Sequence, residues 1–283
     1  MVSNSVVSNV SLTDLHWQWH SWKGLPYLTC NLLSNWQHGF FTRQFYPCPP
    51  EELTPVLKPD AVVYRVKQVH GNSVLNPKEI ELSKSDLAAL ASINGDSENF
   101  FPDGDGLITD RPYQAVWVAS ADCNPVLIGD VVTGQVSAVH AGWRGTAQKI
   151  VPQAIARFLA HGSVKDNLRI AIGPAIAGQV YQVDTFVAAE VGASVISSTQ
   201  TKNEQDIIAA LKEFPDSPIL DDDAVGKVRL DVRRINQIQI EQLDIHPQHI
   251  AIAPHCTYQH SDRFFSYRRT GEKKVQWSGI VSN

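Results

Sequence analysis

Three residues in the middle of the chain, His70, Cys123 and His140, have side chains that bind metals and lie in sequence surroundings typical of active sites. Each follows an apolar, strand-like stretch and precedes small or turn-forming residues. Because α/β proteins place their sites where strands end at one edge of a sheet, we expect the three side chains to meet there.

These residue types suit a catalytic zinc site. Two imidazoles and one thiolate are good zinc ligands, and a centre with three protein ligands keeps its fourth position open for water. Water bound at such a position becomes hydroxide near neutral pH. The three residues are far apart in the chain, so their spacing alone does not establish the site.

Two other interpretations of the same residues stay open. In the first, Cys123 is a buried structural thiol and the two histidines are bonded to the backbone, since buried free cysteine is common. In the second, the protein is a Cys-dependent hydrolase or amidase, with Cys123 as nucleophile and His140 or His70 as its base.

The turn after His140, residues 140–145, is a candidate anion site. A strand followed by a glycine-containing turn and the start of a helix leaves main-chain N–H groups free, and Arg144 adds a fork of donors. The lysine and glycine pattern of a Walker loop is absent. The alternative is that Gly142 and Gly145 only allow the helix to pack closely on the sheet.

Four further side chains are candidates for contacts with substrate or phosphate: Arg43, Gln68, Tyr181 and Arg268. Tyr181 could stack on a base or fill the core, and the arginines could bind phosphate or lie exposed. Residues 264–267 are strand-like, and alternation along a strand sends Arg268 and Arg269 to opposite faces, so at most one of them points into a site.

Two acidic features of the sequence are assigned no chemistry. Residues 103–106, Asp-Gly-Asp-Gly, lack the later glutamate of a calcium loop and are predicted to form a tight acidic turn. Asp122, next to Cys123, is predicted to face away from it on the strand. The sequence therefore does not identify a general acid or base.

The elements that must position these residues alternate between strands and helices. Their periodicity predicts strands at 16–22, 61–69, 115–120, 126–128, 135–139, 168–172, 250–253 and 264–267. Helical spacing predicts helices at 144–160, 184–195, 203–214 and 231–243, and the proline-rich stretch 47–59 is predicted to be a loop. This order indicates an α/β fold, α+β-like in places, with a central mixed β-sheet flanked by helices.

Composition narrows the class of protein. Of the 283 residues 43% are hydrophobic and 19% charged, which is ordinary globular composition. We expect residues 1–14 to be a flexible tail and residues 15–283 to form one catalytic domain. The net charge of −5, from 24 basic and 29 acidic residues, predicts no nucleic-acid partner.

The chain is also expected to act in the cytoplasm, away from membranes. It shows no secretory signal and no apolar stretch long enough to cross a bilayer. Its four cysteines include no Cys-x-x-Cys pair, which favours reduced thiols over a disulfide scaffold.

Taken together, the motifs resemble one family: the bacterial laccase-domain family, also called multicopper polyphenol oxidoreductase and later assigned as purine nucleoside phosphorylase with adenosine deaminase activity. The matching pieces run in order over nearly the whole chain. They are residues 38–43 (His-Gly-Phe-Phe-Thr-Arg), 68–71 (Gln-Val-His-Gly), 105–107 (Asp-Gly-Leu), 121–125 (Ala-Asp-Cys-Asn-Pro), 140–145 (His-Ala-Gly-Trp-Arg-Gly), 172–176 (Ile-Gly-Pro-Ala-Ile), 256–257 (Cys-Thr) and 264–269 (Phe-Phe-Ser-Tyr-Arg-Arg). No single piece is decisive, but the ordered set is highly specific.

The resemblance implies a single α/β domain, related in fold to a bacterial deamidating toxin. It implies that the family's metal ligands fall on His70, Cys123 and His140. It also implies phosphorolysis of adenosine, inosine and methylthioadenosine, with purine nucleoside and phosphate as partners, and hydrolytic deamination of adenosine. Zinc is the expected metal, with copper as the alternative.

The sequence departs from the family pattern in two loops. Family members usually have Gly-Gly-Val-Ser where residues 44–47 read Gln-Phe-Tyr-Pro, and often Thr-Gly-Arg where residues 270–274 read Thr-Gly-Glu-Lys-Lys. Substrate contacts from these loops therefore do not carry over, whereas the triad is unaffected.

Other functions are less well supported by the residues. A blue-copper site usually needs an axial methionine, and the one methionine here is Met1. A laccase-type copper cluster needs paired histidines, and no His-x-His occurs. A copper-dependent polyphenol oxidase and a non-catalytic nucleoside-binding protein are thus kept as alternatives to the phosphorylase.

Overall fold

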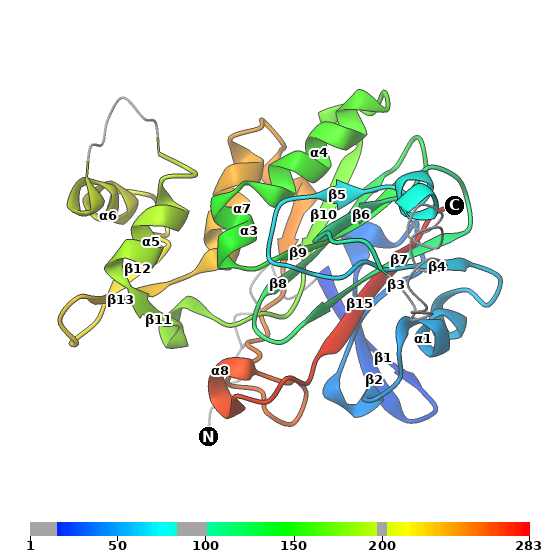
Figure 1. Cartoon of the computed structure of the whole chain (residues 1–283), viewed down its shortest axis with the longest axis horizontal. Coiled ribbons are helices and arrows are strands. Elements are labelled where there is room, and N and C mark those ends of the chain that lie inside the picture. Colours follow the sequence, from blue (N-terminus) through cyan, green and yellow to red (C-terminus); the bar gives the residue numbers. More distant parts are fainter. Residues whose placement is uncertain (1–15, 84–100, 197–202) are drawn as a thin grey trace, which may run out of the picture.

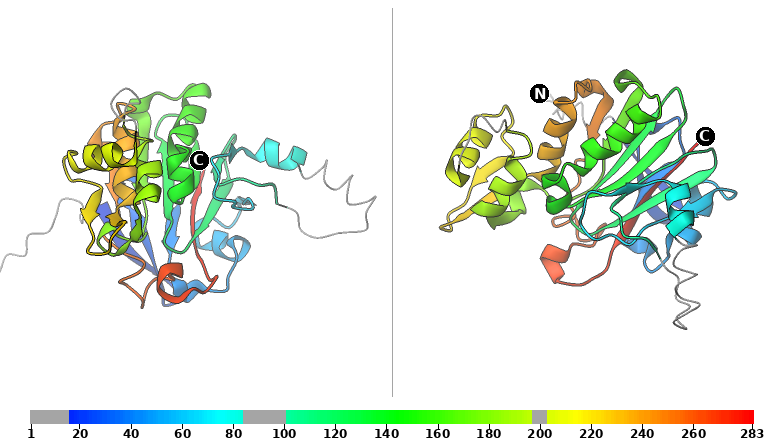
Figure 2. Two further views of the ribbon diagram at one scale, coloured as in Figure 1. Left: turned by 60° about the vertical axis from the view of Figure 1, so that its left-hand side comes forward. Right: turned by 45° about the horizontal axis from the view of Figure 1, so that its top comes forward.

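Two six-stranded β-sheets lie face to face, with helices on both outer sides (Figures 1 and 2). The computed structural model describes residues 16–83, 101–196 and 203–283. The expected flexible tail, residues 1–14, lies outside the described residues.

The first sheet is antiparallel except for one edge, where β4 runs parallel to β7. In spatial order its strands are β1 (Trp17–Trp22), β2 (Leu25–Cys30), β3 (His38–Phe41), β15 (Gln276–Val281), β7 (Gln114–Ser120) and β4 (Val62–Tyr64). The strand latest in the chain thus lies in the middle of the sheet.

The second sheet contains the candidate ligand His140 in β9, and Cys123 directly precedes its strand β8. In spatial order its strands are β14 (Ile250–Ile252), β10 (Leu168–Ile172), β8 (Asn124–Asp130), β9 (Val136–Ala141), β6 (Gly106–Ile108) and β5 (Val74–Leu75). Its four central strands are antiparallel, and its two edge strands, β14 and β5, run parallel to their neighbours.

Strand alternation divides the apolar side chains between layers. Val118 of β7 and Leu127 of β8 point into the core between the two sheets. On the other face of β7, Trp117 packs among residues of α1, where its Nε1–H donates to Thr54 Oγ1. On the other face of β8, Ile128 packs against α4. The result is a four-layer arrangement of helix, sheet, sheet and helix.

Helices cover both outer faces of this sandwich. α1 (Pro50–Leu57) covers the first sheet, while α3 (Trp143–Ala147), α4 (Ile150–Ala160) and α7 (Val232–Glu241) lie over the second (Figure 1). At one end a small antiparallel sheet, β11–β13–β12, packs with two helices and α7. Its elements are β11 (Gln182–Asp184), α5 (Thr185–Gly192), α6 (Glu204–Lys212), β12 (Ile219–Asp221) and β13 (Lys227–Leu230).

Short helical turns complete the described chain. α8 (Tyr267–Thr270) precedes β15, and residues 77–83 are helical. Single 3₁₀ turns lie at Asn31–Leu33, Arg43–Phe45, Lys165–Asn167, Gly178–Val180 and Pro247–His249.

The mixed α/β class is confirmed, although the strands divide among two large sheets and a small one where one central sheet was expected. The predicted strands at 16–22, 115–120, 126–128, 135–139, 168–172 and 250–253 are present, as are the helices within 184–195, 203–214 and 231–243. The strand expected at 61–69 is shorter: β4 ends at Tyr64, and beyond it Lys67 makes only an isolated bridge with Asp103.

Three sequence predictions of local structure are wrong. The 47–59 loop contains α1, because Pro50 occupies the first turn, where a missing N–H costs nothing. The 144–160 helix is broken at Lys149, which has φ of 60°. Residues 264–266 are not a strand. The N–H and C=O of Phe265 bond to the Gln276 side chain instead of a neighbouring strand, which satisfies them without a ladder.

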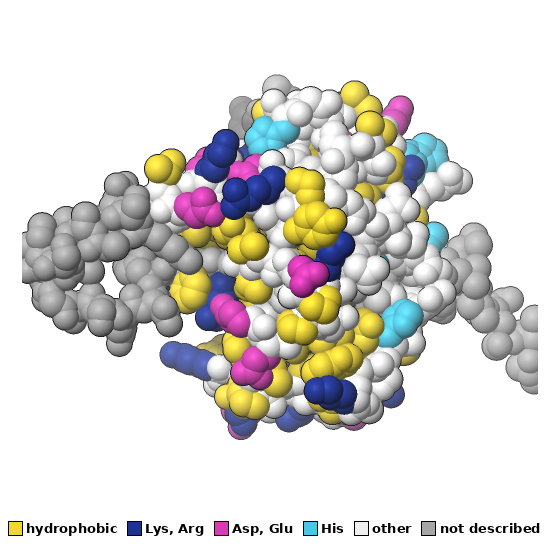
Figure 3. All heavy atoms as spheres, turned by 90° about the vertical axis from the view of Figure 1, so that its right-hand side faces the viewer, with side chains coloured by type: hydrophobic (Ala, Val, Ile, Leu, Met, Phe, Trp, Pro, Cys, Tyr) yellow, Lys and Arg dark blue, Asp and Glu magenta, His cyan; other side chains and the backbone are white. Residues whose placement is uncertain are grey.

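The charged side chains on one face of the molecule are mixed in sign, as expected from the slightly acidic composition (Figure 3). On the face shown in Figure 3, basic and acidic side chains of the described residues are interspersed. Among the described residues, no helix combines the length and apolar character needed to cross a membrane.

His38 in β3 makes the stability of the fold pH-dependent. Its Nε2 accepts the Cys30 N–H and its Nδ1–H donates to the Trp36 carbonyl, while burial lowers the pKa of His38 from 6.5 to about 4. Between these values the unfolded chain binds a proton that the folded chain excludes, so stability falls as the pH falls through this window. The full effect is about 3 kcal/mol, of which about 2 kcal/mol is lost between pH 7 and pH 5.

Urea unfolding of the wild type and His38→Gln at these two pH values measures this contribution. Glutamine can keep both hydrogen bonds but does not titrate. We expect the variant to lose about 2 kcal/mol less than the wild type between pH 7 and pH 5. Equal losses in the two proteins would contradict the assignment.

Candidate metal centre

The structure brings His70, Cys123 and His140 together. Their candidate ligand atoms all lie within 4.8 Å of one another, and within the described residues this is the one group of three or more such side chains. β8 and β9 run antiparallel, with Asn124 opposite Ala141. The start of β8 therefore lies beside the end of β9, which places Cys123 next to His140. His70 approaches from the exposed loop after β4.

The residue after β9 leaves room for this cluster. A Cβ atom on Gly142 would lie 2.9 Å from Cys123 Sγ and 3.2 Å from His70 Cδ2. The φ of Gly142 is −68°, which any residue can adopt, so the requirement for glycine here is one of space. The sequence suggests that this glycine serves close packing of the helix on the sheet. The structure adds a second reason, because a side chain here would collide with the candidate ligands.

Opposite charges stabilise each other in the cluster. Burial opposes ionisation of Cys123, but the charge of His140 and hydrogen bonds from both histidines outweigh it and lower the pKa of Cys123 to about 6. Burial likewise opposes protonation of His140, but the Cys123 thiolate and Asp105 raise the pKa of His140 to about 9. Cys123 is therefore a thiolate near neutral pH, the form that binds metals.

Asp105, which the sequence places in a simple acidic turn, belongs to this site. Its fully buried carboxylate accepts a hydrogen bond from His140 Nδ1 at 2.9 Å. Although burial favours the neutral form, hydrogen bonds from His140 and from the Gly71 N–H hold the pKa of this carboxyl below its ordinary value. The residue lies at the start of β6, which pairs with β9, so only the strand pairing identifies it.

The donor set fits a metal ion with three protein ligands. Asp105 occupies Nδ1 of His140, so Nε2 is the ring nitrogen left for a metal. Tetrahedral zinc separates its donor atoms by roughly 3.5 Å, given Zn–N and Zn–S bonds of about 2.0–2.3 Å. The three donors, which lie within 4.8 Å of one another, would have to draw together to share one ion, and three ligands leave one position open.

Three of the residues predicted to contact substrate lie near the triad. The guanidinium of Arg268 stacks on the Tyr181 ring at 4.7 Å and donates to the Gln182 carbonyl. Burial, reinforced by the charge of Cys123, raises the pKa of Tyr181 to about 12, so its hydroxyl stays protonated. Arg144 is exposed on α3 and stacks on Trp143 at 4.3 Å, and its positive charge acts to lower the pKa of Tyr181 without overcoming the effect of burial.

Arg43 and Gln68 bind backbone groups of distant segments of the chain. Arg43 donates to the Ser261 carbonyl and stacks on the Phe265 ring at 4.6 Å. The Gln68 amide bonds to both the N–H and the C=O of Ala119 at the end of β7. Gln68 thereby ties the loop that carries His70 to the first sheet, and substrate contact by these two residues stays a prediction.

Asp122, the residue before Cys123, joins three segments through its hydrogen bonds, and none of its described bonds is to the triad. Its carboxylate accepts from the Thr257 hydroxyl at 2.6 Å and from the Arg268 N–H at 2.7 Å, and its carbonyl accepts from the Ile176 N–H. The residue has a φ of 97°, which is costly for aspartate and is held by these bonds. Asp122 thus links Cys123, the candidate metal ligand beside it, to the segment that carries Arg268.

Replacing Asp122 with asparagine is expected to lower the free energy of unfolding by about 1–3 kcal/mol. An amide is neutral and its oxygen accepts from one donor, so the two bonds to a carboxylate become at best one bond from the Arg268 N–H and one to the Thr257 hydroxyl oxygen. Hydrogen bonds to an ionised group are stronger than those to a neutral amide, and this difference is the expected loss. Urea unfolding measures the change. Asp262→Asn, which alters an exposed carboxylate paired with Arg263, is the matched control and should change stability by less than about 0.5 kcal/mol. Equal stabilities of the two variants would contradict the role given to Asp122.

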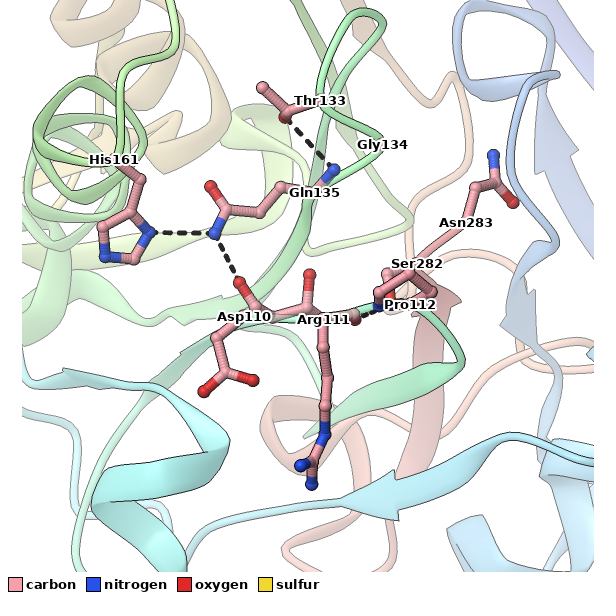
Figure 4. A pocket seen from close by; sticks show the side chains of 10 residues that line it. Asp110, Arg111, Pro112, Thr133, Gly134, Gln135, His161, Ser282 and Asn283 are labelled. Atoms are coloured by element: carbon pink, nitrogen blue, oxygen red, sulfur yellow. Dashed lines mark hydrogen bonds between the residues drawn. The ribbon is translucent and has the colours of Figure 1, made fainter.

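A separate cavity of about 390 Å³ lies beside the C-terminal end of β15 (Figure 4). In it, Gln135 Nε2 donates to His161 Nδ1 at 2.8 Å. None of the residues predicted for the site lines this cavity. Its lining consists of Thr109, Asp110, Arg111, Pro112, Thr133, Gly134, Gln135, His161, Ser282 and Asn283.

The sequence is similar to named bacterial enzymes. Over 273 residues it is 50% identical to a purine nucleoside phosphorylase of Synechocystis sp., a match that covers 96% of this chain and all of that protein. It is 34% identical over 181 residues to a purine nucleoside phosphorylase of Bacteroides thetaiotaomicron, covering 62% and 60% of the two chains. It is 28% identical over 169 residues to adenosine deaminase RL5 of an unknown prokaryotic organism, covering 59% and 57%.

Solved structures share the fold. YlmD from Geobacillus stearothermophilus superimposes with a TM-score of 0.72 at 21% identity, covering 94% of this chain and 98% of that one. The hypothetical protein YfiH of Bacillus licheniformis does so with a TM-score of 0.70 at 22% identity, covering 91% and 96%. The sequence profile of one family, described as multi-copper polyphenol oxidoreductase laccase, matches residues 52–282. The chain therefore belongs to the multi-copper polyphenol oxidoreductase laccase family.

Proposed function

We propose that this protein is a metal-dependent purine nucleoside phosphorylase. It would convert adenosine, inosine or methylthioadenosine and phosphate into the free base and the ribose 1-phosphate. The observation that carries the proposal is the 50% identity, along the full length, to the Synechocystis enzyme of that name. The open three-ligand centre with two arginines nearby adds a site of suitable chemistry.

We propose zinc as the metal, held by His70, Cys123 and His140, with copper as the alternative. The two imidazoles and the thiolate favour zinc, and the fixed proton on His140 Nδ1 supports binding through Nε2. When bound, zinc would supply a Lewis acid that polarises an oxygen of substrate or phosphate.

The protein side chains would bind and orient the two substrates. Arg144 and Arg268 carry guanidinium groups whose paired donors match phosphate oxygens, and both lie near Tyr181. Tyr181 offers a ring for stacking on the purine and a protonated hydroxyl that can donate a hydrogen bond. Arg43 and Gln68 would act on the substrates mainly by fixing the loops around them.

We also propose that residues 15–283 act as one catalytic domain in the cytoplasm. The four cysteines are free thiols in the structure, which supports a reducing compartment. Hydrolytic deamination of adenosine is a further proposed activity of the same site, supported by the 28% identity to adenosine deaminase RL5.

A second candidate function is that of a Cys-dependent hydrolase. One specific observation favours it: His140 lies between Asp105 and the Cys123 thiolate, the order in which cysteine hydrolases arrange acid, base and nucleophile. This chemistry would need a metal-free thiolate, whereas phosphorolysis would need the metal, so removal of metal separates the two.

Product analysis tests these proposals. Zinc-loaded protein is incubated with adenosine, with and without phosphate, and then again after treatment with a chelator. We expect adenine and ribose 1-phosphate to form only when both phosphate and metal are present. Inosine that forms without phosphate would indicate deamination. If neither product forms, the proposed function is wrong, and the hydrolase or nucleoside-binding interpretation takes its place.

A further inference from the structure

We propose that Asp105 is the positioning residue of the metal centre, a single carboxylate that orients both histidine ligands at once. In the described contacts it does not touch Arg144 or Arg268, the arginines proposed to bind the substrates. It acts through His70 and His140. The inference rests on the proposed metal site but not on the reaction assigned to it.

Both oxygens of the Asp105 carboxylate accept two hydrogen bonds each. Its Oδ1 accepts from His140 Nδ1 and from the His70 N–H, each at 2.9 Å. Its Oδ2 accepts from the Val69 N–H at 3.1 Å and from the Gly71 N–H at 2.7 Å. Because Asp105 is fully buried, water cannot replace any of these four bonds.

The bond to His140 decides which ring nitrogen faces the metal. An imidazole whose Nδ1–H is held by a carboxylate presents the lone pair of Nε2, and the same bond fixes the ring plane. The negative charge behind the ring also makes Nε2 a stronger donor to a cation.

The bonds to residues 69–71 shape the loop that carries the other histidine. Three successive main-chain N–H groups surround the carboxylate in the manner of an anion-binding nest. His70, the middle residue, has a φ of 60°, a left-handed conformation that costs roughly 1 kcal/mol or more in a residue other than glycine. The carboxylate offsets this cost, so it selects the backbone conformation in which the His70 ring meets Cys123.

Asp105 is itself fixed to the sheet. Its carbonyl accepts from the His140 N–H at 2.7 Å, and its own N–H donates to the Ser73 carbonyl at 3.0 Å. The next residue, Gly106, pairs with Val139 in β9. Asp105 therefore holds the loop of residues 69–71 in a fixed position relative to the second sheet.

Asp105→Asn tests the proposal with little change in volume. An amide cannot accept all four bonds, so we expect zinc affinity to fall about 10- to 100-fold, as is typical when a partner of a ligating histidine is lost. Asp103→Asn, two residues earlier in an exposed pair with Lys67, is the matched control and should bind zinc as the wild type does. Affinity is measured by competition with a chromophoric chelator, and the Co²⁺-loaded proteins report ligand geometry through their thiolate charge-transfer absorption.

A purely structural role would give a different pattern. In that case Asp105→Asn would lower the stability of the metal-free protein but leave zinc affinity and the Co²⁺ spectrum unchanged, and the proposal would be overturned. Should the variant not fold, ¹H–¹⁵N NMR of the histidine rings in zinc-loaded wild type decides the matter. The expected result is a proton on Nδ1 of His140, and metal on Nδ1 would refute the inference.

These outcomes are separable from the proposed function. A wild type that binds zinc but fails to cleave nucleosides would refute the phosphorylase and leave the role of Asp105 intact. An Asp105→Asn protein that binds zinc normally would refute the role of Asp105 whatever the reaction is.

Discussion

Cys123→Ala is expected to abolish both metal binding and nucleoside phosphorolysis. The substitution removes one of three ligands and the thiolate charge that favours a divalent cation. Loss of a metal that supplies several kcal/mol of stabilisation lowers kcat/KM by about a thousandfold or more. Zinc content is measured by atomic absorption on the purified protein, and phosphorolysis by the release of adenine.

Cys48→Ala provides the control for this experiment. Cys48 is a half-buried thiol in the segment before α1, and it packs in the cluster between α1 and the first sheet, which contains none of the triad residues. The same chemical change there should leave zinc content and activity within about twofold of the wild type, as for a substitution away from the site. A Cys123→Ala protein that retained its full zinc content would show that the triad is not the metal centre.

Gly142→Ala should damage the site by adding a single methyl group. The new Cβ would lie 2.9 Å from Cys123 Sγ and 3.2 Å from His70 Cδ2, so both ligands must move. A displacement of about 1 Å in an active site costs on the order of 100-fold in rate, and overpacking costs about 1–3 kcal/mol of stability. We expect kcat/KM to fall by about that factor, with weaker zinc binding.

Gly71→Ala is the control that shows whether any added methyl group near the site, and not only one at position 142, weakens zinc binding. At Gly71 the nearest atoms to an added Cβ are Asp105 Oδ2 at 3.6 Å and Val69 Cγ2 at 3.7 Å, which are ordinary contacts. The Gly71 variant should therefore keep most of its zinc affinity. If both variants behaved alike, or if Gly142→Ala were fully active, crowding of the ligands would not be the reason for glycine at position 142.

The parts of the fold that the sequence predicts are those with strong local periodicity. β8 and β10 are rich in apolar residues at strand spacing and lie within a few residues of their expected places, and α4 occupies the apolar C-terminal part of the helix expected at 144–160. β15 gave no such signal because it contains Gly279. In the structure, the Trp117 ring occupies the space of the missing Cβ, with its nearest atoms 2.4 Å from where that atom would be.

The candidate metal ligands can be named from the sequence, but the residues that hold them in place cannot. Metal-binding chemistry is a property of single side chains, so His70, Cys123 and His140 are recognisable in the sequence. The role of Asp105 depends on the pairing of β6 with β9, which no local pattern encodes. The positions of Arg43 and Gln68 likewise depend on partners far along the chain, Ser261 and Ala119.

The central place of β15 in the first sheet has a consequence for biosynthesis. β15 lies between β3 and β7, yet it follows every other described strand in the chain. During translation, the facing edges of β3 and β7 therefore stay unpaired until residues 276–281 emerge from the ribosome. Open strand edges invite pairing with other chains, so the nascent chain is most exposed to aggregation before β15 takes its place between them.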